Sequence, residues 1–117
     1  MQYTCRKDDV SLFSQLVKGV LEGCVLAIIA EEETYGYEIM EKLAARGFHF
    51  AKEGSIYPLL LRLEREKLVE STLRPSPSGP NRKYYRLSEE GASQLAQFRS
   101  GWQELAQAVD AILHQKG

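Results

Sequence analysis

Apolar and small side chains recur every three or four positions in the first part of the chain, from Val10 to Ala27. This spacing predicts a long helix that is buried along much of its surface. Gly19 and Gly23 both lie within it. Glycine weakens a helix by roughly 1 kcal/mol relative to alanine, so we expect this pair to allow the close approach of another backbone. The carboxylates at 31–33 oppose the helix dipole and predict an exit into a turn.

Two shorter helices are predicted next. The first begins near residues 34–36 and ends at Gly47, a residue type suited to a left-handed cap. The second begins near Ser55, whose hydroxyl can accept a free backbone N–H, and tolerates Pro58 in its first turn. Their inward faces are Ile39, Met40 and Leu43 for the first, and Ile56, Leu59, Leu60 and Leu63 for the second.

Beyond these helices the pattern changes to β-prone residues. Two such runs, 68–74 and 82–87, flank a segment rich in proline, serine and glycine at 75–81. This arrangement predicts a β-hairpin with a flexible tip. Ser88 then provides a hydroxyl cap for a last helix, whose first turn carries acidic residues that suit the positive end of the helix dipole.

The last predicted helix carries the clearest periodic pattern of the chain. Its apolar residues are spaced alternately by three and four positions: Leu95, Phe98, Trp102, Leu105, Val109 and Ile112. Such a seam requires a partner helix. Because it is too short for an independent coiled coil, we expect the partner to come from the same fold or from a second copy of the chain.

The predicted fold is therefore mainly α with a small β-hairpin. Three helices followed by a hairpin match the layout of a winged helix-turn-helix, in which the third helix enters the DNA major groove and the hairpin contacts the adjacent backbone. We expect residues 1–87 to form this DNA-binding unit. Residues 88–117 would add a carboxyl-terminal dimerisation helix to the same compact unit, with the amino-terminal helix sharing in dimerisation.

The charged residues are unevenly distributed along the chain, which the formal net charge does not reveal. The formal net charge is −1, which argues against a uniformly basic protein. Between Lys42 and Arg86, however, ten basic residues outnumber four acidic ones, a difference of +6, whereas the remainder has five basic and twelve acidic residues, a difference of −7. A basic middle with acidic flanks is the local patch that phosphate binding requires.

Candidate DNA contacts lie on the third helix and on the wing. On the helix they are Ser55, Tyr57, Arg62 and Arg65, and on the wing they are Arg74, Asn81, Arg82 and Lys83. Guanidinium and hydroxyl groups suit guanine edges and phosphates, and Arg62 and Ser55 are the favoured reading residues. The alternatives remain that Ser55 only caps, that the arginines pair with Glu66 or Glu70, and that the wing tip is a solvated turn.

Three stretches of the sequence resemble a known family. They read YGYEI at 35–39, GSIYPLL at 54–60 with RLERE at 62–66, and GPNRKYYRLS at 79–88 with Gly91. Together they look like the signatures of PadR-type transcriptional regulators, over roughly Leu16 to Ile112. One departure is Lys67, where that family commonly has glycine after the recognition helix, and we expect it to alter only the cap.

The resemblance implies a homodimeric repressor that binds a pseudo-palindromic DNA operator and often releases it on sensing a small aromatic or drug-like compound. Trp102 lies in the middle of the seam and could stack such an effector, with Phe13 and Val17 as possible facing residues. Packing within the interface is the favoured interpretation of Trp102, because tryptophan contributes much burial energy.

Other classes of protein find less support. No nucleophile, base and orienting group are placed together, and we expect no enzyme, cofactor or resident metal. A metal-responsive regulator would have to use Cys5, Cys24, His49 or His114, which lack metal-ligand spacing. A winged-helix module that binds protein is a further alternative, since its wing need not be basic. We expect no membrane association and a cytoplasmic location, because no membrane span or secretory signal is recognisable.

Overall fold

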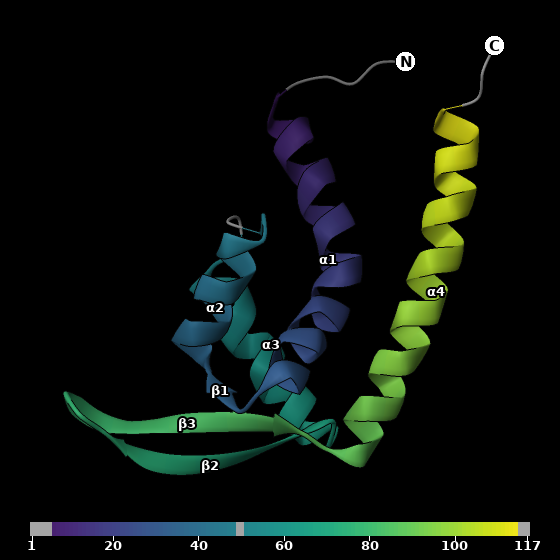
Figure 1. The fold of residues 1–117 in the computed structure, drawn as a ribbon. Coiled ribbons are helices and arrows are strands. Elements are labelled where there is room, and N and C mark those ends of the chain that lie inside the picture. Colours follow the sequence, from purple (N-terminus) through teal and green to yellow (C-terminus); the bar gives the residue numbers. More distant parts are fainter. Residues whose placement is uncertain (1–5, 49–50, 115–117) are drawn as a thin grey trace.

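The computed structural model describes residues 6–48 and 51–114. Its elements follow in the order α1 (Arg6–Glu31), β1 (Thr34–Tyr35), α2 (Gly36–Ala45), α3 (Glu53–Arg65), β2 (Val69–Ser76), β3 (Gly79–Leu87) and α4 (Glu89–Leu113). Figure 1 shows α2 and α3 on one side of α1, α4 on the other, and the β2–β3 hairpin extending beyond the helices as a wing. The predicted fold class, mainly helical with a small hairpin in a winged-helix arrangement, is confirmed.

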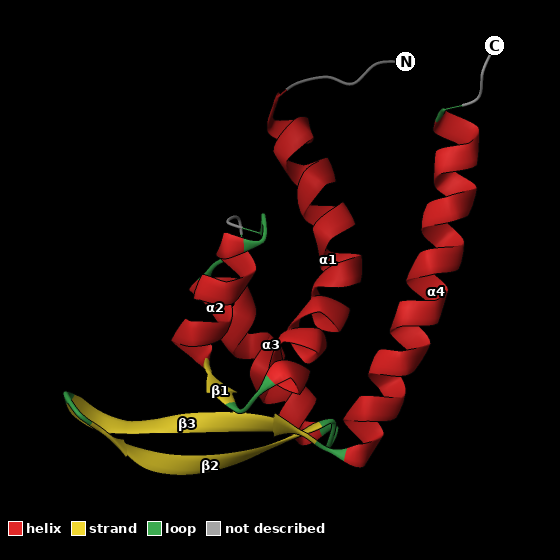
Figure 2. Ribbon diagram, viewed as in Figure 1, coloured by secondary structure: helices red, strands yellow, loops and turns green. Residues whose placement is uncertain are grey.

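The sheet contains one strand more than the sequence predicted. It is antiparallel with the order β1-β3-β2 (Figure 2). Thr34 and Tyr35 of β1 pair with Tyr85 and Tyr84 of β3. Two residues are too few to show an alternating pattern, which explains why β1 was missed. Thr34 is fully buried, and its hydroxyl donates to Glu38 Oε1 at 2.6 Å.

The tip of the wing is shorter than predicted. The segment 75–81 was expected to be a loop, but β2 continues to Ser76 and β3 begins at Gly79, so only residues 77–78 connect the strands. The ladder is irregular between Arg74 and Ser76. Pro75 lies at this irregularity, where its missing N–H interrupts no regular pairing.

The start of α3 also differs from the prediction. The helix begins at Glu53 with Lys52 as its N-cap, and no side chain caps it, so the prediction that Ser55 caps this helix is wrong. Pro58 consequently lies inside the helix, beyond its first turn. The predicted cap at Ser88 is confirmed, since its hydroxyl accepts from the Gly91 N–H at 3.0 Å.

Helices α2 and α3 end in the same way. In each, the residue after the C-cap has positive φ: Gly47 at 104° and Lys67 at 65°. The following N–H then reaches back to the helix, from Phe48 to the Leu43 carbonyl and from Leu68 to the Leu63 carbonyl. Both ends are Schellman motifs. Lys67 therefore occupies the cap as expected, in a backbone region that favours glycine.

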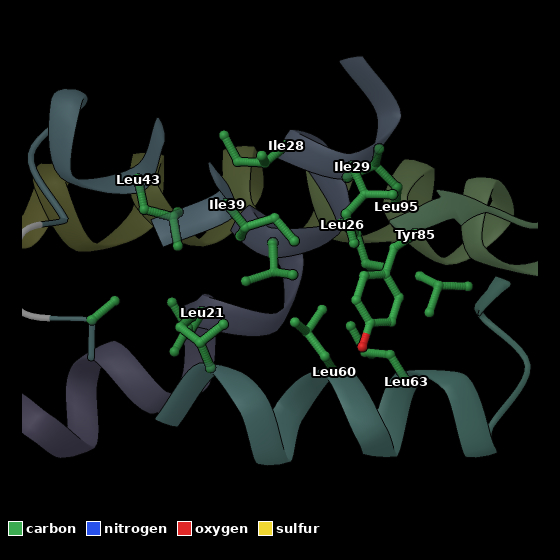
Figure 3. Packing of buried hydrophobic residues seen from close by; sticks show 14 residues of the cluster. Leu21, Leu26, Ile28, Ile29, Ile39, Leu43, Leu60, Leu63, Tyr85 and Leu95 are labelled. Atoms are coloured by element: carbon green, nitrogen blue, oxygen red, sulfur yellow. The ribbon is translucent and has the colours of Figure 1, made fainter. Parts of the chain in front are cut away.

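The core is built from the apolar faces of all the helices and one side of the sheet. It comprises Leu21, Val25, Leu26, Ile28, Ile29, Ile39, Leu43, Ala51, Ile56, Leu60, Leu63, Val69, Tyr85 and Leu95. Figure 3 shows Tyr85 of β3 beside Leu26 of α1, Leu63 of α3 and Leu95 of α4. The predicted inward faces of α2 and α3 supply much of this cluster.

Among the described residues, helix α4 is packed only at its amino-terminal end. Leu95 is buried in the core. A Cβ on Gly23 of α1 would collide with the Phe98 ring. Gly23 therefore allows the close approach of a side chain, whereas the close approach of another backbone was predicted. Toward the carboxyl-terminal end of α4, the apolar side chains are exposed: Trp102, Leu105, Val109, Ile112 and Leu113. Within the described residues, no helix is long and apolar enough to cross a membrane.

Candidate nucleic-acid interface

Helix α3 presents a continuous outward face. Ile56, Leu60 and Leu63 are fully buried, whereas Gly54, Pro58, Leu61 and Arg65 are all exposed. These four positions follow the spacing of one helix face, opposite the buried one. The side chains on the outward face of α3 are therefore those of Pro58, Leu61 and Arg65. Sequence reasoning missed Leu61, although its position outside the apolar stripe was a visible signal.

Ser55 and Tyr57 lie toward the amino-terminal end of the same helix. Ser55 is exposed, and Tyr57 is 42% exposed. The Tyr57 ring packs over Gly36 at the start of α2, where an added Cβ would lie 2.5 Å from Tyr57 Cε1. Burial, and then the nearby Glu53 carboxylate, raise the pKa of Tyr57. Its hydroxyl therefore remains a hydrogen-bond donor at neutral pH.

Arg62 has a different environment from Arg65. Its Nη2 donates to Glu22 Oε1 of α1 at 2.8 Å, and its Nη1 lies 3.3 Å from Glu66 Oε1. The predicted reading residue thus links α3 to α1. A contact between Arg62 and DNA requires these carboxylates to be exchanged for DNA groups, whereas Arg65 has no carboxylate partner among the described residues.

The predicted wing residues divide between the two faces of the hairpin. Arg74 and Arg82 are directly opposite each other in the ladder. Arg74 lies over the Tyr84 ring at 4.7 Å and Arg82 over the Tyr35 ring at 4.4 Å, while the two rings are 5.2 Å apart. Cation–π contacts of this kind hold the two guanidinium groups in place on the wing.

Lys83 lies on the opposite face, because successive side chains alternate along a strand. Its Nζ is 2.8 Å from Glu64 Oε1 of α3, and the Ser71 hydroxyl donates to Glu64 Oε2 at 2.5 Å. The hydrogen bond from Lys83, followed by that from Ser71, lowers the pKa of Glu64. Glu64 therefore connects both strands of the wing to the recognition helix. Asn81 is exposed near the tip.

Much of the basic middle is compensated within the chain. The three consecutive carboxylates at the end of α1 each hold a cation: Glu31 binds Arg46 at 2.6 Å, Glu32 binds Lys42 at 3.1 Å and Glu33 binds Arg74 at 2.6 Å. Exposed pairs of this kind contribute only about 0–1 kcal/mol, so a phosphate can displace the carboxylate at little cost. In the part of the chain that the structure describes, Lys52, Arg65, Lys67 and Arg82 have no carboxylate partner.

A second feature lies between α1 and α4. It is a mostly apolar cavity of about 420 Å³ with Gly23 and Cys24 on one side and Phe98 and Trp102 on the other, and Arg99 is also part of its lining. Trp102 is 47% exposed. The three predicted effector residues do not all reach it: Val17 packs against the core instead, and the side chain of Phe13 lies outside the part described.

Of the four residues considered for a metal site, the two that the structure describes lie on separate elements. Cys24 is in α1 and His114 follows α4, while Cys5 and His49 lie outside the described residues. Burial raises the pKa of the Cys24 thiol, which keeps it neutral. Across 6–48 and 51–114, no group of three or more His, Cys, Asp or Glu side chains could hold an ion.

The three-helix arrangement with its basic wing defines a winged-helix transcriptional regulator. The sequence profile of the transcriptional regulator PadR-like family matches residues 25–97, and the chain belongs to that family. The resemblance drawn from the sequence is therefore confirmed. Members of this family are transcriptional regulators and not enzymes, in agreement with the absence of a catalytic arrangement in the sequence.

Individual relatives agree with this assignment. A PadR-like transcriptional regulator from Bacillus cereus is 51% identical, with 87% of this chain and 99% of that chain covered and a TM-score of 0.79. A Streptococcus transcriptional regulator is 46% identical, covering 86% and 98% with a TM-score of 0.76. A transcriptional regulator of Mycobacterium tuberculosis is 32% identical over 73% of this chain and 78% of its own length.

Proposed function

We propose that this chain acts as a homodimeric, sequence-specific DNA-binding repressor that a small aromatic or drug-like compound releases from its operator. The observation that carries the DNA-binding part is the outward face of α3 beside a basic wing. Arg65 protrudes from that face without a carboxylate partner in the described residues, and Arg82 is held on a tyrosine ring. Both are positioned to meet phosphates or base edges.

The homodimer is supported by the exposed part of α4. Trp102, Leu105, Val109 and Ile112 form an apolar stripe that no other described element covers. Leu95 is already buried in its own chain, so the interface we propose uses the four exposed members of the predicted seam, with Phe98 at its edge. Two recognition helices in such a dimer would require half-sites about one DNA turn apart, in a pseudo-palindromic operator.

Titration of the purified protein against its own promoter DNA, at increasing salt, tests the DNA-binding proposal. Specific binding that weakens steeply with salt is expected, because each neutralised phosphate releases counterions. Absence of binding, or indifference to salt, contradicts the proposal and favours a winged-helix module that binds protein. Repression is tested separately, by measuring whether loss of the regulator raises transcription of the adjacent genes.

Substitutions separate the proposed contacts. Replacing Arg82 and Lys83 by alanine should weaken binding to all DNA sequences and make the affinity less dependent on salt concentration. Arg65→Ala or Arg62→Ala should weaken binding and also relax the preference for particular sequences. Arg99→Ala, which removes the same charge from α4, is the matched control. If the Arg62 change lowers stability but leaves sequence preference unaltered, Arg62 serves only to join α3 to α1.

The effector proposal rests on the cavity between α1 and α4, where Trp102 lines an apolar space. Trp102 is the single tryptophan of the sequence, so all tryptophan fluorescence comes from this one position. Planar aromatic compounds should quench that fluorescence and, at the same concentrations, release DNA. A flat response across a broad panel of such compounds favours the alternative in which Trp102 only packs in the dimer interface.

A further inference from the structure

Leu61 is an exposed leucine at the centre of the recognition helix. It is 54% exposed, whereas Leu60 beside it is fully buried. Pro58 precedes it and Arg65 follows it on the same outward face, and both are also exposed. The middle of this face thus presents hydrocarbon where a helix that reads DNA through hydrogen bonds alone would present polar groups.

The major groove offers one apolar feature on its base edges. Thymine carries a 5-methyl group there, next to its O4 acceptor, and apolar side chains recognise it by contact. Guanine and adenine present hydrogen-bonding groups in this groove, and unmodified cytosine carries only a hydrogen atom at C5, so none of them offers a methyl group. A leucine on the face that enters the groove therefore discriminates in favour of a base with a 5-methyl group.

We infer that Leu61 is a specificity-determining residue, which contacts the 5-methyl group of a thymine in each half-site of the operator. The inference rests on the proposed DNA-binding function and names a base that this function leaves open. The charge around Leu61 favours DNA over an apolar protein partner, because Arg65 lies one turn away on the same face and Glu64 is engaged by Lys83.

The experiment begins with selection of duplexes from a random library by the wild-type protein. Each dT of the selected operator is then replaced by dU, which keeps the base pair and removes only the methyl group. Affinity is measured by fluorescence anisotropy. At one dT in each half-site, the substitution should weaken binding about fourfold, the effect of removing one buried methyl group from the interface.

The variant Leu61→Ala identifies the side chain responsible. It should bind the dT and dU operators equally well, so the fourfold ratio falls to about one. The variant should fold, since the side chain is largely exposed and alanine favours helices. Leu73→Ala is the matched control, because Leu73 is 64% exposed on the wing and its loss should leave the ratio unchanged.

Each other outcome contradicts a different step. If the library yields no preferred duplex, the proposed DNA-binding function fails. If specific duplexes are selected but no dT is sensitive to loss of its methyl group, or if Leu61→Ala retains the dT preference, the inference about Leu61 fails while DNA binding stands. If Leu73→Ala abolishes the preference instead, the methyl group is read by the wing.

Discussion

Apolar side chains are buried in the winged-helix part of this chain but exposed on the distal half of α4. In the first, the inward faces of α1, α2 and α3 and one side of the sheet enclose one another (Figure 3). In the second, a stripe of equal regularity lies open, with Trp102, Leu105 and Ile112 exposed. A periodic apolar pattern thus predicts a helix in both regions. Only in the winged-helix part, however, does the surface that covers the apolar face come from the same chain.

The same contrast separates the folding stability of the single chain from the stability that is gained on association with a partner. The winged-helix part contains its own partners, so its stability belongs to the single chain. The stripe on α4 gains burial energy only when another surface covers it, and its contribution depends on the concentration of that partner. Substitutions in the two regions should therefore change different measurements.

The largest effect is expected in the core. Leu60→Ala should lower the free energy of unfolding by about 3 kcal/mol, because it removes buried methyl groups and leaves a cavity. Leu61→Ala, one residue along the same helix, should change it by less than about 0.5 kcal/mol. Urea denaturation followed by circular dichroism, at one protein concentration, measures both. Equal losses would contradict the assignment of the buried and outward faces of α3.

The next effect concerns the open stripe. Leu105→Asp should weaken self-association by about 2 kcal/mol, roughly thirtyfold, because it buries a charge at the centre of the proposed interface. Gln107→Asp places the same charge away from the stripe and serves as control. Sedimentation equilibrium distinguishes them. If both variants self-associate like the wild type, the stripe is not the dimer interface.

The sequence predicts most of the fold because most elements are local patterns. The seam of α4, the cap at Ser88 and the hairpin all follow from spacing and residue type. The strand β1 does not, because its two residues acquire a partner only through Tyr84 and Tyr85, far along the chain. The start of α3 was misplaced since Ser55 is a good capping residue type and Gly54 a poor helix former, yet both lie in its first turn.

The site was less predictable than the fold for a related reason. Residue type identified Arg62 and Lys83 as cations that suit phosphates, but their partners Glu22 and Glu64 come from other elements and become neighbours only in three dimensions. Alternation along β3 could have separated Lys83 from Arg82. The outward position of Leu61 was also within reach, because the stripe of Ile56, Leu60 and Leu63 excludes it.

A smaller effect compares two helix ends within the winged-helix part. Lys67→Gly should raise the free energy of unfolding by about 0.5 kcal/mol, since glycine relieves left-handed backbone strain but has more entropy in the unfolded chain. Gly47→Lys should lower it by about 1 kcal/mol, through the backbone alone, because no atom lies within 4 Å of an added Cβ. Thermal unfolding measures both changes. Changes of the same sign would contradict the equivalence of the two caps.

The smallest effect is the dependence of the wing on pH. Because the pKa of Glu64 is lowered by Lys83 and Ser71, this carboxylate stabilises the folded state at pH values above its ordinary pKa of 4.5. That stability is lost as the pH falls from there through the lowered value. Glu64→Gln should therefore lower the free energy of unfolding by no more than about 0.3 kcal/mol at neutral pH. It should also reduce the loss of stability that occurs as the pH falls below 4.5. Glu41→Gln, on the exposed side of α2, should leave this loss at acid pH unchanged. Urea denaturation at a series of pH values between 3 and 7 measures the difference, and an unchanged loss at acid pH in Glu64→Gln would show that the wing is held to α3 without this ion pair.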